Sequence, residues 1–269
     1  MKPFLKWAGG KFRARQRIKE LLPPGKRLIE PFVGAGSIFL NTDYADYLLA
    51  DNNADLIALY KHLRQEGDEF IEYCRQFFTL ANNTAEKYYA FRELFNATAD
   101  TRVKSALFLY LNRHGYNGLC RYNSSGTYNV PFGTYTKPLF PSETLKNFHY
   151  KSQQAHFITA DFVETMRQAT AGDVIYCDPP FVPLSDTAKF TSYSTYQFTA
   201  AQQLQLAKEA ERLAAQGITV VISNHNTEFV CETYANAQLF FFDVERFISR
   251  DIANRRPVKE VLAVFGGRT

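Results

Sequence analysis

The sequence predicts an α/β protein built on a parallel sheet. Short apolar runs alternate with amphipathic helical stretches, which is the rhythm of strand–helix–strand units. Glycines or acidic residues directly follow several of these runs. In such sheets ligands bind where strands end at their carboxyl side, so we expect a binding site at that edge. The predicted strands are residues 27–31, 47–50, 156–159, 174–177, 218–223, 238–248 and 258–265.

Composition places the chain among ordinary globular proteins. It has 269 residues, of which 46% are hydrophobic and 22% charged, enough to bury a substantial core. No apolar run approaches the roughly 20 residues needed to span a bilayer, and the amino terminus lacks the apolar core of a secretory signal. The four cysteines are scattered without metal-ligand spacing, so we expect reduced thiols in a cytoplasmic protein. They are Cys74, Cys120, Cys177 and Cys231.

The net positive charge comes from one segment that has no acidic residues. The whole chain has a formal net charge of only +4, but residues 101–142 contain five basic residues and no Asp or Glu. The same segment is rich in Tyr, Asn and Gly. A basic, aromatic segment without acids indicates contact with a polyanion, although a solvated loop is the alternative.

A glycine-rich turn follows the first predicted strand. It contains Gly34 and Gly36, a helix is expected after it through Asn41, and Asp51 ends the next strand. This order is typical of a site where backbone approaches a nucleoside and the acid binds its ribose. A dinucleotide fingerprint would need a third glycine where Phe39 stands, so a nicotinamide cofactor is disfavoured. A nucleoside ligand without pyrophosphate fits better.

Helical spacing dominates the region from the second strand to about Asn112. Thr84 and Asp100 are expected to cap two of its helices. A further helix, residues 199–216, carries a capping box of Thr199 and Gln202. Other expected elements are a helix at 12–22, a short helix after Asp161, a hairpin or loop module at 112–135, a long polar loop at 181–198, a helix ending near Asn236, and a basic connection with Arg250, Arg255 and Arg256.

The stretch Asp178-Pro179-Pro180-Phe181 ends the fourth predicted strand. Proline cannot donate to a ladder, so the sheet must stop here and leave by a stiff exit. A carboxylate, a backbone carbonyl and an aromatic ring are thereby held near one another. They suit a flat ligand that carries an amino group, whose two hydrogens the oxygens could accept while the ring stacks on its face. A plain strand end followed by a turn is the alternative.

Several motifs of the chain, in their order, resemble those of the α-class (D12) DNA adenine-N6 methyltransferases. The motifs that carry the resemblance are residues 4–11 (FLKWAGGK), 30–37 (EPFVGAGS), Asp161-Phe162 and 178–181 (DPPF), in the order seen in that family. Residues 117–123 (NGLCRYN), 129–133 (NVPFG) and 223–225 (SNH) resemble, more narrowly, the Dam enzymes that act on GATC.

The resemblance implies a Rossmann-like, S-adenosylmethionine-dependent methyltransferase sheet with an inserted helical target-recognition domain. The implied domains are residues 1–53 and 145–269 for the catalytic part and 54–144 for the insertion. Residues implied to bind the S-adenosyl-L-methionine cofactor are Trp7, Lys11, Glu30, Phe32, Gly34, Gly36, Ser37, Asp51, Asp161, Phe162 and Asp178.

By the same resemblance, the partner is double-stranded DNA. Residues implied to contact it are Lys6, Tyr116, Asn117, Leu119, Arg121, Pro131 and Tyr135. Lys6 would contact the first guanine, and Tyr116 and Asn117 would help displace the target base. We expect no metal, no membrane association, and a monomer that acts in the cytoplasm of a bacterial or phage-infected cell.

Asp178, Pro179, Pro180 and Phe181 are the implied catalytic residues. If Asp178 and the Pro179 carbonyl accept the two N6 hydrogens, the lone pair gains sp3 character and can attack a methyl group. These acceptors strengthen as charge develops on N6, so they favour the transition state. The family usually has Tyr where this chain has Phe181, and we expect activity because stacking needs only the ring.

Four other functions compete with this hypothesis. An N4-cytosine methyltransferase uses the same pocket logic but usually has Ser at the position of Asp178. A non-catalytic DNA-binding module could have lost turnover through Phe181. An oxidoreductase is disfavoured by Phe39, and a metal nuclease by the lack of a histidine cluster. The histidines are His62, His114, His149, His156 and His225.

Overall fold

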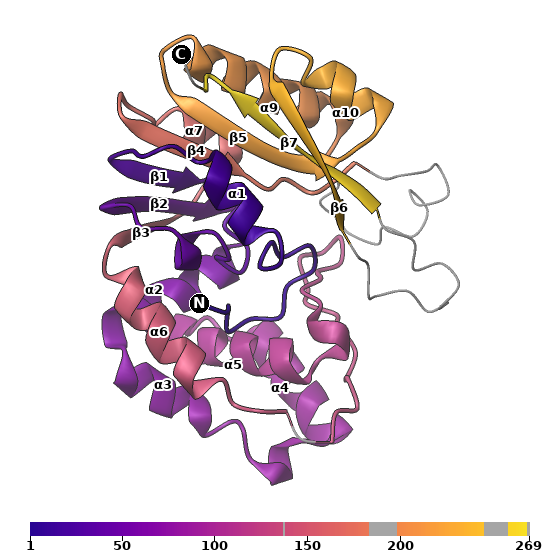
Figure 1. The fold of residues 1–269 in the computed structure, drawn as a ribbon. Helices are drawn as coiled ribbons and strands as arrows, with labels where there is room; N and C mark the ends of the chain where they lie inside the picture. Colours follow the sequence, from indigo (N-terminus) through magenta and orange to yellow (C-terminus); the bar gives the residue numbers. More distant parts are fainter. Residues whose placement is uncertain (137, 183–197, 245–257, 268–269) are drawn as a thin grey trace. The chain divides into compact units, whose positions relative to one another are not determined.

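The computed structural model describes residues 1–136, 138–182, 198–244 and 258–267. In this part of the chain a seven-stranded sheet has the order β3-β2-β1-β4-β5-β7-β6 (Figure 1). Its strands are β1 (Arg27–Glu30), β2 (Asp46–Asp51), β3 (Ala155–Thr159), β4 (Asp173–Cys177), β5 (Thr219–His225), β6 (Gln238–Val244) and β7 (Val258–Phe265). Helices occur between most of them, so the predicted α/β class is confirmed.

The sheet is mixed rather than wholly parallel. Strands β1, β4 and β5 run parallel, but β7 is antiparallel to both of its neighbours, β5 and β6. The prediction of a parallel sheet was therefore wrong for β7, whereas β6, which is antiparallel to β7, runs in the same direction as β5. Strands β6 and β7 are consecutive in the chain and adjacent in the sheet, and a parallel pair would have needed a crossover connection.

The chain forms two compact units, each made of three segments. Unit 1 consists of Met1–Arg13, Val33–Asp43 and Leu49–Thr159. Unit 2 consists of Ala14–Phe32, Tyr44–Leu48 and Ala160–Thr269. The predicted recognition insertion, residues 54–144, falls within unit 1, and its status as a separate domain stays a prediction.

Much of unit 1 is helical, and the two helix starts predicted to be capped show the expected chemistry. The Thr84 hydroxyl accepts from Lys87 N at 3.2 Å, and the Asp100 carboxylate accepts from the Arg102 and Val103 amides at 2.9 and 3.1 Å. Both predicted caps are confirmed. The helices are α2 (Ala54–Glu66), α3 (Asp68–Arg75), α4 (Ala85–Ala97), α5 (Thr101–His114) and α6 (Ser142–Ser152).

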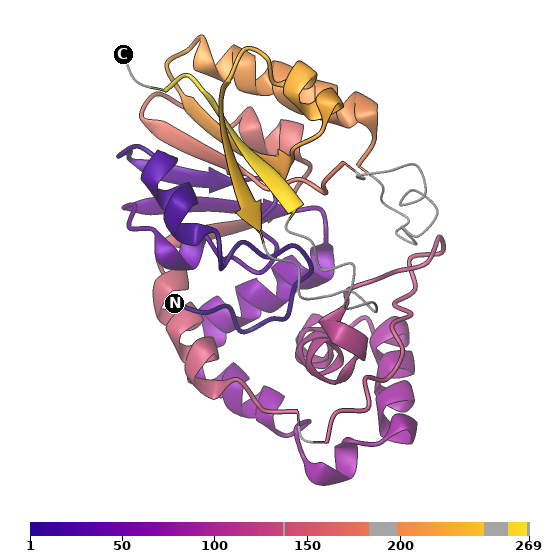
Figure 2. The ribbon, with the colours of Figure 1, turned by 45° about the vertical axis from the view of Figure 1, so that its right-hand side comes forward.

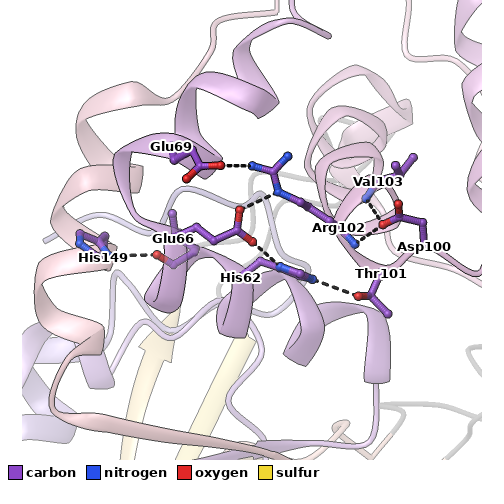
Figure 3. A network of polar contacts seen from close by, with 9 residues as sticks. His62, Glu66, Glu69, Asp100, Thr101, Arg102, Val103 and His149 are labelled. Atoms are coloured by element: carbon purple, nitrogen blue, oxygen red, sulfur yellow. Dashed lines mark hydrogen bonds and ion pairs between the residues drawn. The ribbon is translucent and has the colours of Figure 1, made fainter.

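Helix α5 is the core of unit 1, because every residue from Ser105 to Asn112 is buried. Its first turn is fixed by Arg102, which pairs with Glu66 at 2.6 Å and with Glu69 at 3.0 Å (Figure 3). His62 contacts Glu66 with one ring nitrogen and Thr101 with the other. This network joins α2, α3 and α5 at one end of the bundle.

In unit 2, helix α9 (Ala200–Ala214) begins with the predicted capping box, since Thr199 and Gln202 each bond the other's backbone or side chain. Gly217 follows its end at a φ of 77°. Helices α7 (Phe162–Met166) and α10 (Glu228–Thr233) both pack against α9 (Figures 1 and 2). Helix α1 (Arg15–Leu21) contacts β6 through Arg17, whose guanidinium lies 5.4 Å from the Phe242 ring.

Several predicted bounds were wrong. The helix expected after the glycine turn is a single 3-10 turn, Phe39–Asn41. Gly34 and Gly36 both take positive φ, so no α-helix can begin before residue 37. Helix α1 starts later than predicted, and α6 was not predicted. Strand β5 continues through His225, because its pairing with β7 extends to that residue.

Four predicted ligand-binding positions do lie at the carboxyl ends of strands. The glycine turn follows β1, Asp51 is the last residue of β2, Asp161 follows β3, and Asp178 follows β4 directly. Most of the predicted polar loop at 181–198, and the basic residues Arg250, Arg255 and Arg256, lie outside the described residues.

Candidate active site and nucleic-acid interface

In unit 1 the glycine turn is bound to the acid at the end of β2. Gly34 N donates to Asp51 Oδ2 at 3.2 Å, and Asn53 N donates to Asp51 Oδ1 at 3.0 Å. Both carboxylate oxygens are therefore oriented by backbone amides. Burial nevertheless raises the pKa of Asp51 to about 6, because the charged form loses more hydration than these bonds return.

Trp7 lies directly against this turn. Gly34 has a φ of 44°, and a Cβ built there would come within 2.7 Å of the Trp7 Nε1 atom. Only glycine satisfies both the backbone angle and the close approach. Ser37 is buried at the end of the turn, and the buried Lys11 donates from Nζ to the Gly9 carbonyl at 2.8 Å. Among the predicted cofactor residues of unit 1, Trp7 thus packs against Gly34, and Gly34 also bonds the oriented Asp51 carboxylate.

The predicted cofactor residues of unit 2 centre on aromatic rings. Phe32 and Phe162 stack at 5.6 Å with an interplanar angle of 23°, and Phe198 packs its ring edge-on against both. Asp161 accepts from Glu164 N at 2.9 Å and so caps α7, while Glu30 at the end of β1 is buried. Phe198 was not singled out from the sequence, since its only local signal was a position just before the capping box.

The Asp178–Phe181 motif emerges from β4, whose five residues are all buried. Next to it, the Phe181 ring meets the His225 ring edge-to-face at 4.7 Å. Val182 N donates to Asn224 Oδ1 at 3.2 Å, and His225 Nδ1 lies 2.8 Å from the Val182 carbonyl. The end of β5 therefore supports the segment that follows β4. The sequence motif at 223–225 thus contacts residues 181 and 182.

The module after α5, residues 115–135, is a short irregular hairpin in unit 1. Bridges pair Gly115 with Phe132 and Tyr122 with Tyr128. Its second limb runs along α4 (Figure 2), because α4 side chains bond its carbonyls: Tyr88 and Arg92 donate to Val130 O at 3.0 and 3.1 Å. The predicted loop module is thus an ordered structure fixed by a helix.

The predicted DNA-contacting side chains of this module are at least partly exposed. Tyr116 is 46% exposed, and Asn117 takes a φ of 53° that turns the chain sharply. Arg121 donates from Nε to Asn129 Oδ1 at 2.7 Å. Its guanidinium is thereby held in a fixed direction while half-buried. Leu119 and Pro131 also reach the surface to different degrees.

Lys6 and Tyr135 come together beside this module. The Lys6 ammonium lies 3.9 Å from the centroid of the Tyr135 ring, and the Tyr135 hydroxyl accepts from Asn117 N at 3.0 Å. Burial and the nearby Arg113 guanidinium lower the pKa of Lys6. An anion would relieve this repulsion. Three residues predicted to contact DNA, Lys6, Asn117 and Tyr135, therefore form one connected group, and Tyr116 directly precedes Asn117.

This arrangement agrees with a comparison against protein families. The family described as "D12 class N6 adenine-specific DNA methyltransferase" matches residues 7–247 of the chain. The chain belongs to this family. It is accordingly an enzyme that transfers a methyl group to N6 of adenine in DNA.

Characterised relatives extend the match over nearly the whole chain. The chain is 50% identical over 262 residues to the DNA adenine methylase of Escherichia coli strain K12, covering 97% of this chain and 94% of that one. It is 49% identical to the DNA adenine methylase of Serratia marcescens, covering 97% of each chain. Among solved structures, the rRNA methyltransferase AviRa of Streptomyces viridochromogenes gives a TM-score of 0.39 at 12% identity over 97% of this chain and 87% of that one.

The described residues of this family member hold no group of three or more His, Cys, Asp or Glu side chains that could bind a metal ion. Among the same residues, no helix is long and apolar enough to cross a membrane.

Three buried amides next to the predicted site residues were missed or only partly recognised. Asn224 belongs to a predicted motif but has no assigned role, Asn112 stands at the start of the predicted loop module, and Gln203 lies within the predicted helix at 199–216. A signal did exist for Gln203: it shares the helical spacing of Leu206 and Ala210, both buried. An amide on an apolar helix face must find a hydrogen-bond partner.

Proposed function

We propose that this family member methylates N6 of the adenine in duplex GATC sites, with S-adenosyl-L-methionine as methyl donor and Asp178–Phe181 as the clamp on the extruded base. The observation that carries the proposal is the motif's position: it leaves a fully buried parallel strand and is braced by the end of the next one. The family match and the GATC-type motifs support the substrate.

The residues of unit 1 fit the nucleoside part of the donor. Asp51 ends β2 with its carboxylate already oriented, and such an acid suits the two hydroxyls of a ribose. The contact between Trp7 and Gly34 leaves no room for a side chain at the turn, so the backbone itself faces the ligand. When bound, the donor supplies a methyl group activated by a positive sulfur. The same residues would bind it in the absence of DNA.

The clamp makes the adenine amine nucleophilic. Asp178 and the Pro179 carbonyl accept the two N6 hydrogens, which localises the lone pair on N6. As positive charge develops there, both acceptors bind more strongly, so they stabilise the transition state more than the ground state. Stacking on Phe181 recovers part of the cost of a few kcal/mol for extruding the base.

Recognition of the site is assigned to the hairpin and the amino-terminal segment. Arg121, Leu119, Pro131 and Tyr135 would read the outer bases, and Lys6 would contact the first guanine. The absence of acidic residues at 101–142 supports contact with the phosphate backbone. We further propose a monomer with the recognition insertion at 54–144, acting on DNA in the cytoplasm.

Methylation of an unmethylated plasmid tests the proposal. After incubation with enzyme and donor, the plasmid should resist an endonuclease that is blocked by GATC methylation and become sensitive to one that requires it. Nucleoside analysis should give N6-methyladenine. Recovery of N4-methylcytosine would instead favour the cytosine-directed alternative, and no transfer from labelled donor would favour a non-catalytic DNA-binding module.

A further inference from the structure

The clamp motif has few backbone groups with which to hold itself in place. Pro179 and Pro180 have no N–H, so neither can donate to a neighbouring strand. Between the end of β4 and Val182, the backbone donors are those of Asp178 and Phe181 alone. The stretch must therefore be positioned largely through its carbonyls and through side chains from elsewhere in unit 2.

Two buried amides from α9 and β5 supply this support. Gln203 Nε2 donates to the Pro180 carbonyl at 3.1 Å, and Gln203 Oε1 accepts from Asn224 Nδ2 at 3.1 Å. Asn224 Oδ1 then accepts from Val182 N at 3.2 Å. The three bonds close a ring with the backbone of residues 180–182, and Phe181 lies at the centre of that backbone arc.

The ring is deeply buried, and each amide nitrogen and oxygen in it has a hydrogen-bond partner. Gln203 is 1% exposed and Asn224 is 0% exposed. The hydroxyl of the buried Tyr234, just after α10, also donates to Gln203 Oε1 at 2.9 Å. A shift of the motif would leave one of these groups unpaired away from water, which is costly, so the network strongly favours one position.

His225 adds a contact to the Phe181 ring itself. Its backbone N donates to Asn224 Oδ1 at 2.9 Å, and its ring meets Phe181 edge-to-face with an interplanar angle of 77°. Phe181 has no hydroxyl that could anchor its ring. The fixed backbone on both sides and the His225 edge therefore both contribute to its orientation.

We propose that Gln203 and Asn224 are positioning residues. They set the placement of Phe181 against the extruded adenine but do not themselves contact the adenine. This inference rests on the proposed function of the motif. A reacting pair must be aligned closely, and a displacement of about 1 Å can cost on the order of 100-fold in rate. The two amides bond the backbone on either side of the stacking residue, where a displacement would matter most.

Replacement of Gln203 by Met tests the inference, because Met has a similar length and no hydrogen-bonding amide. We expect the single-turnover methylation rate on a GATC duplex, at saturating donor, to fall on the order of 10- to 100-fold. The affinities for duplex and donor should stay within about threefold, since no direct contact is lost. With 2-aminopurine at the target position, the fluorescence of the bound duplex should change, because the stacking partner is displaced.

Gln202→Ala is the matched control. Gln202 is the preceding residue of the same helix and bonds Thr199 in the capping box, not the motif. Its replacement should lower the melting temperature while the rate per active molecule and the 2-aminopurine signal stay at wild-type values. Active-site titration with labelled donor corrects each rate for the folded fraction.

Gln203→Glu provides a second variant and is used if Gln203→Met does not fold. Glu keeps the acceptor for Tyr234 and Asn224 but sets a carboxylate oxygen against the Pro180 carbonyl, so the corrected rate should fall at least as far as in Gln203→Met. A corrected rate and a 2-aminopurine signal equal to wild type in the folded Gln203 variant would overturn the inference. A wild-type protein that does not methylate adenine would refute the proposed function instead.

Discussion

Asn112 and Lys6 are joined by a pair of hydrogen bonds across 106 positions of sequence. The Asn112 side chain accepts from Lys6 N at 2.9 Å and donates to Lys6 O at 2.8 Å, as a neighbouring strand would. The same amide also donates to the Gly118 carbonyl at 3.1 Å. One buried residue of α5 therefore fixes both the amino-terminal segment and the turn that starts the recognition module.

The first prediction concerns this pair. Asn112→Ala should lower the free energy of unfolding by about 1–3 kcal/mol, because the partly buried backbone groups of Lys6 lose their partner. The folded variant should also discriminate less well between GATC and duplexes in which the first guanine is replaced, because Lys6 is no longer held in place. Urea unfolding and methylation of substituted duplexes measure the two effects. Asn147→Ala, at a half-buried position of α6, serves as the control and should change neither.

Asp178→Ala is expected to remove methylation while leaving DNA affinity within a few fold. The carboxylate acts on N6 in the transition state, and loss of one such group typically costs on the order of 10²- to 10³-fold. Transfer of labelled methyl groups and duplex binding are the two measurements. Turnover at the wild-type rate would exclude the assigned role.

Arg121→Ala should relax site specificity more than it lowers the maximal rate. A bidentate arginine–guanine contact contributes about 1–3 kcal/mol of discrimination at its base. Arg121 is held by Asn129, so the loss should be confined to one position of the site. The measurement is the ratio of kcat/KM for GATC and for duplexes changed at each base. An unchanged ratio at every base would contradict the assignment.

Phe181→Tyr and Phe181→Ala separate the ring from the hydroxyl. The Tyr variant should keep the wild-type rate within about threefold, because stacking comes from the ring. The Ala variant should lose about 1–3 kcal/mol of stabilisation of the extruded base. Single-turnover rates on one GATC duplex compare the three proteins. A much faster Tyr variant would show that the family's usual hydroxyl contributes to catalysis.

Donor binding should weaken at low pH because Asp51 becomes protonated. Burial raises the pKa of Asp51 to about 6. The ribose needs the carboxylate form, so affinity should fall by up to tenfold per pH unit below 6. The effect on folding has the opposite sign. Because the folded pKa is above the unfolded value of about 3.9, this group favours folding fully below pH 4 and loses that contribution as the pH rises through 6. Calorimetry of donor binding from pH 5 to 8 measures the first effect. Asp51→Asn is the control, and its weaker binding should not show this pH dependence.

Local chemistry explains which elements could be predicted from the sequence. The caps at Thr84, Asp100 and Thr199 were predictable because each bonds an amide two or three residues away. The positions of Asp51 and Asp178 were predictable because proline and polar residues end apolar strands. The helix after the glycine turn was mispredicted because two positive φ angles, rather than the following apolar residues, decided the local structure.

What the sequence by itself determined is the α/β class, the family, and the order of the motifs along the chain. Each depends on residues close together in sequence. The tertiary structure alone decided that β7 runs antiparallel, and that Asn112 holds Lys6 while Gln203 and Asn224 enclose Phe181. Those contacts join residues between 21 and 106 positions apart. No local pattern specifies such partners, because a buried amide needs a hydrogen bond but its own segment does not dictate which group supplies it.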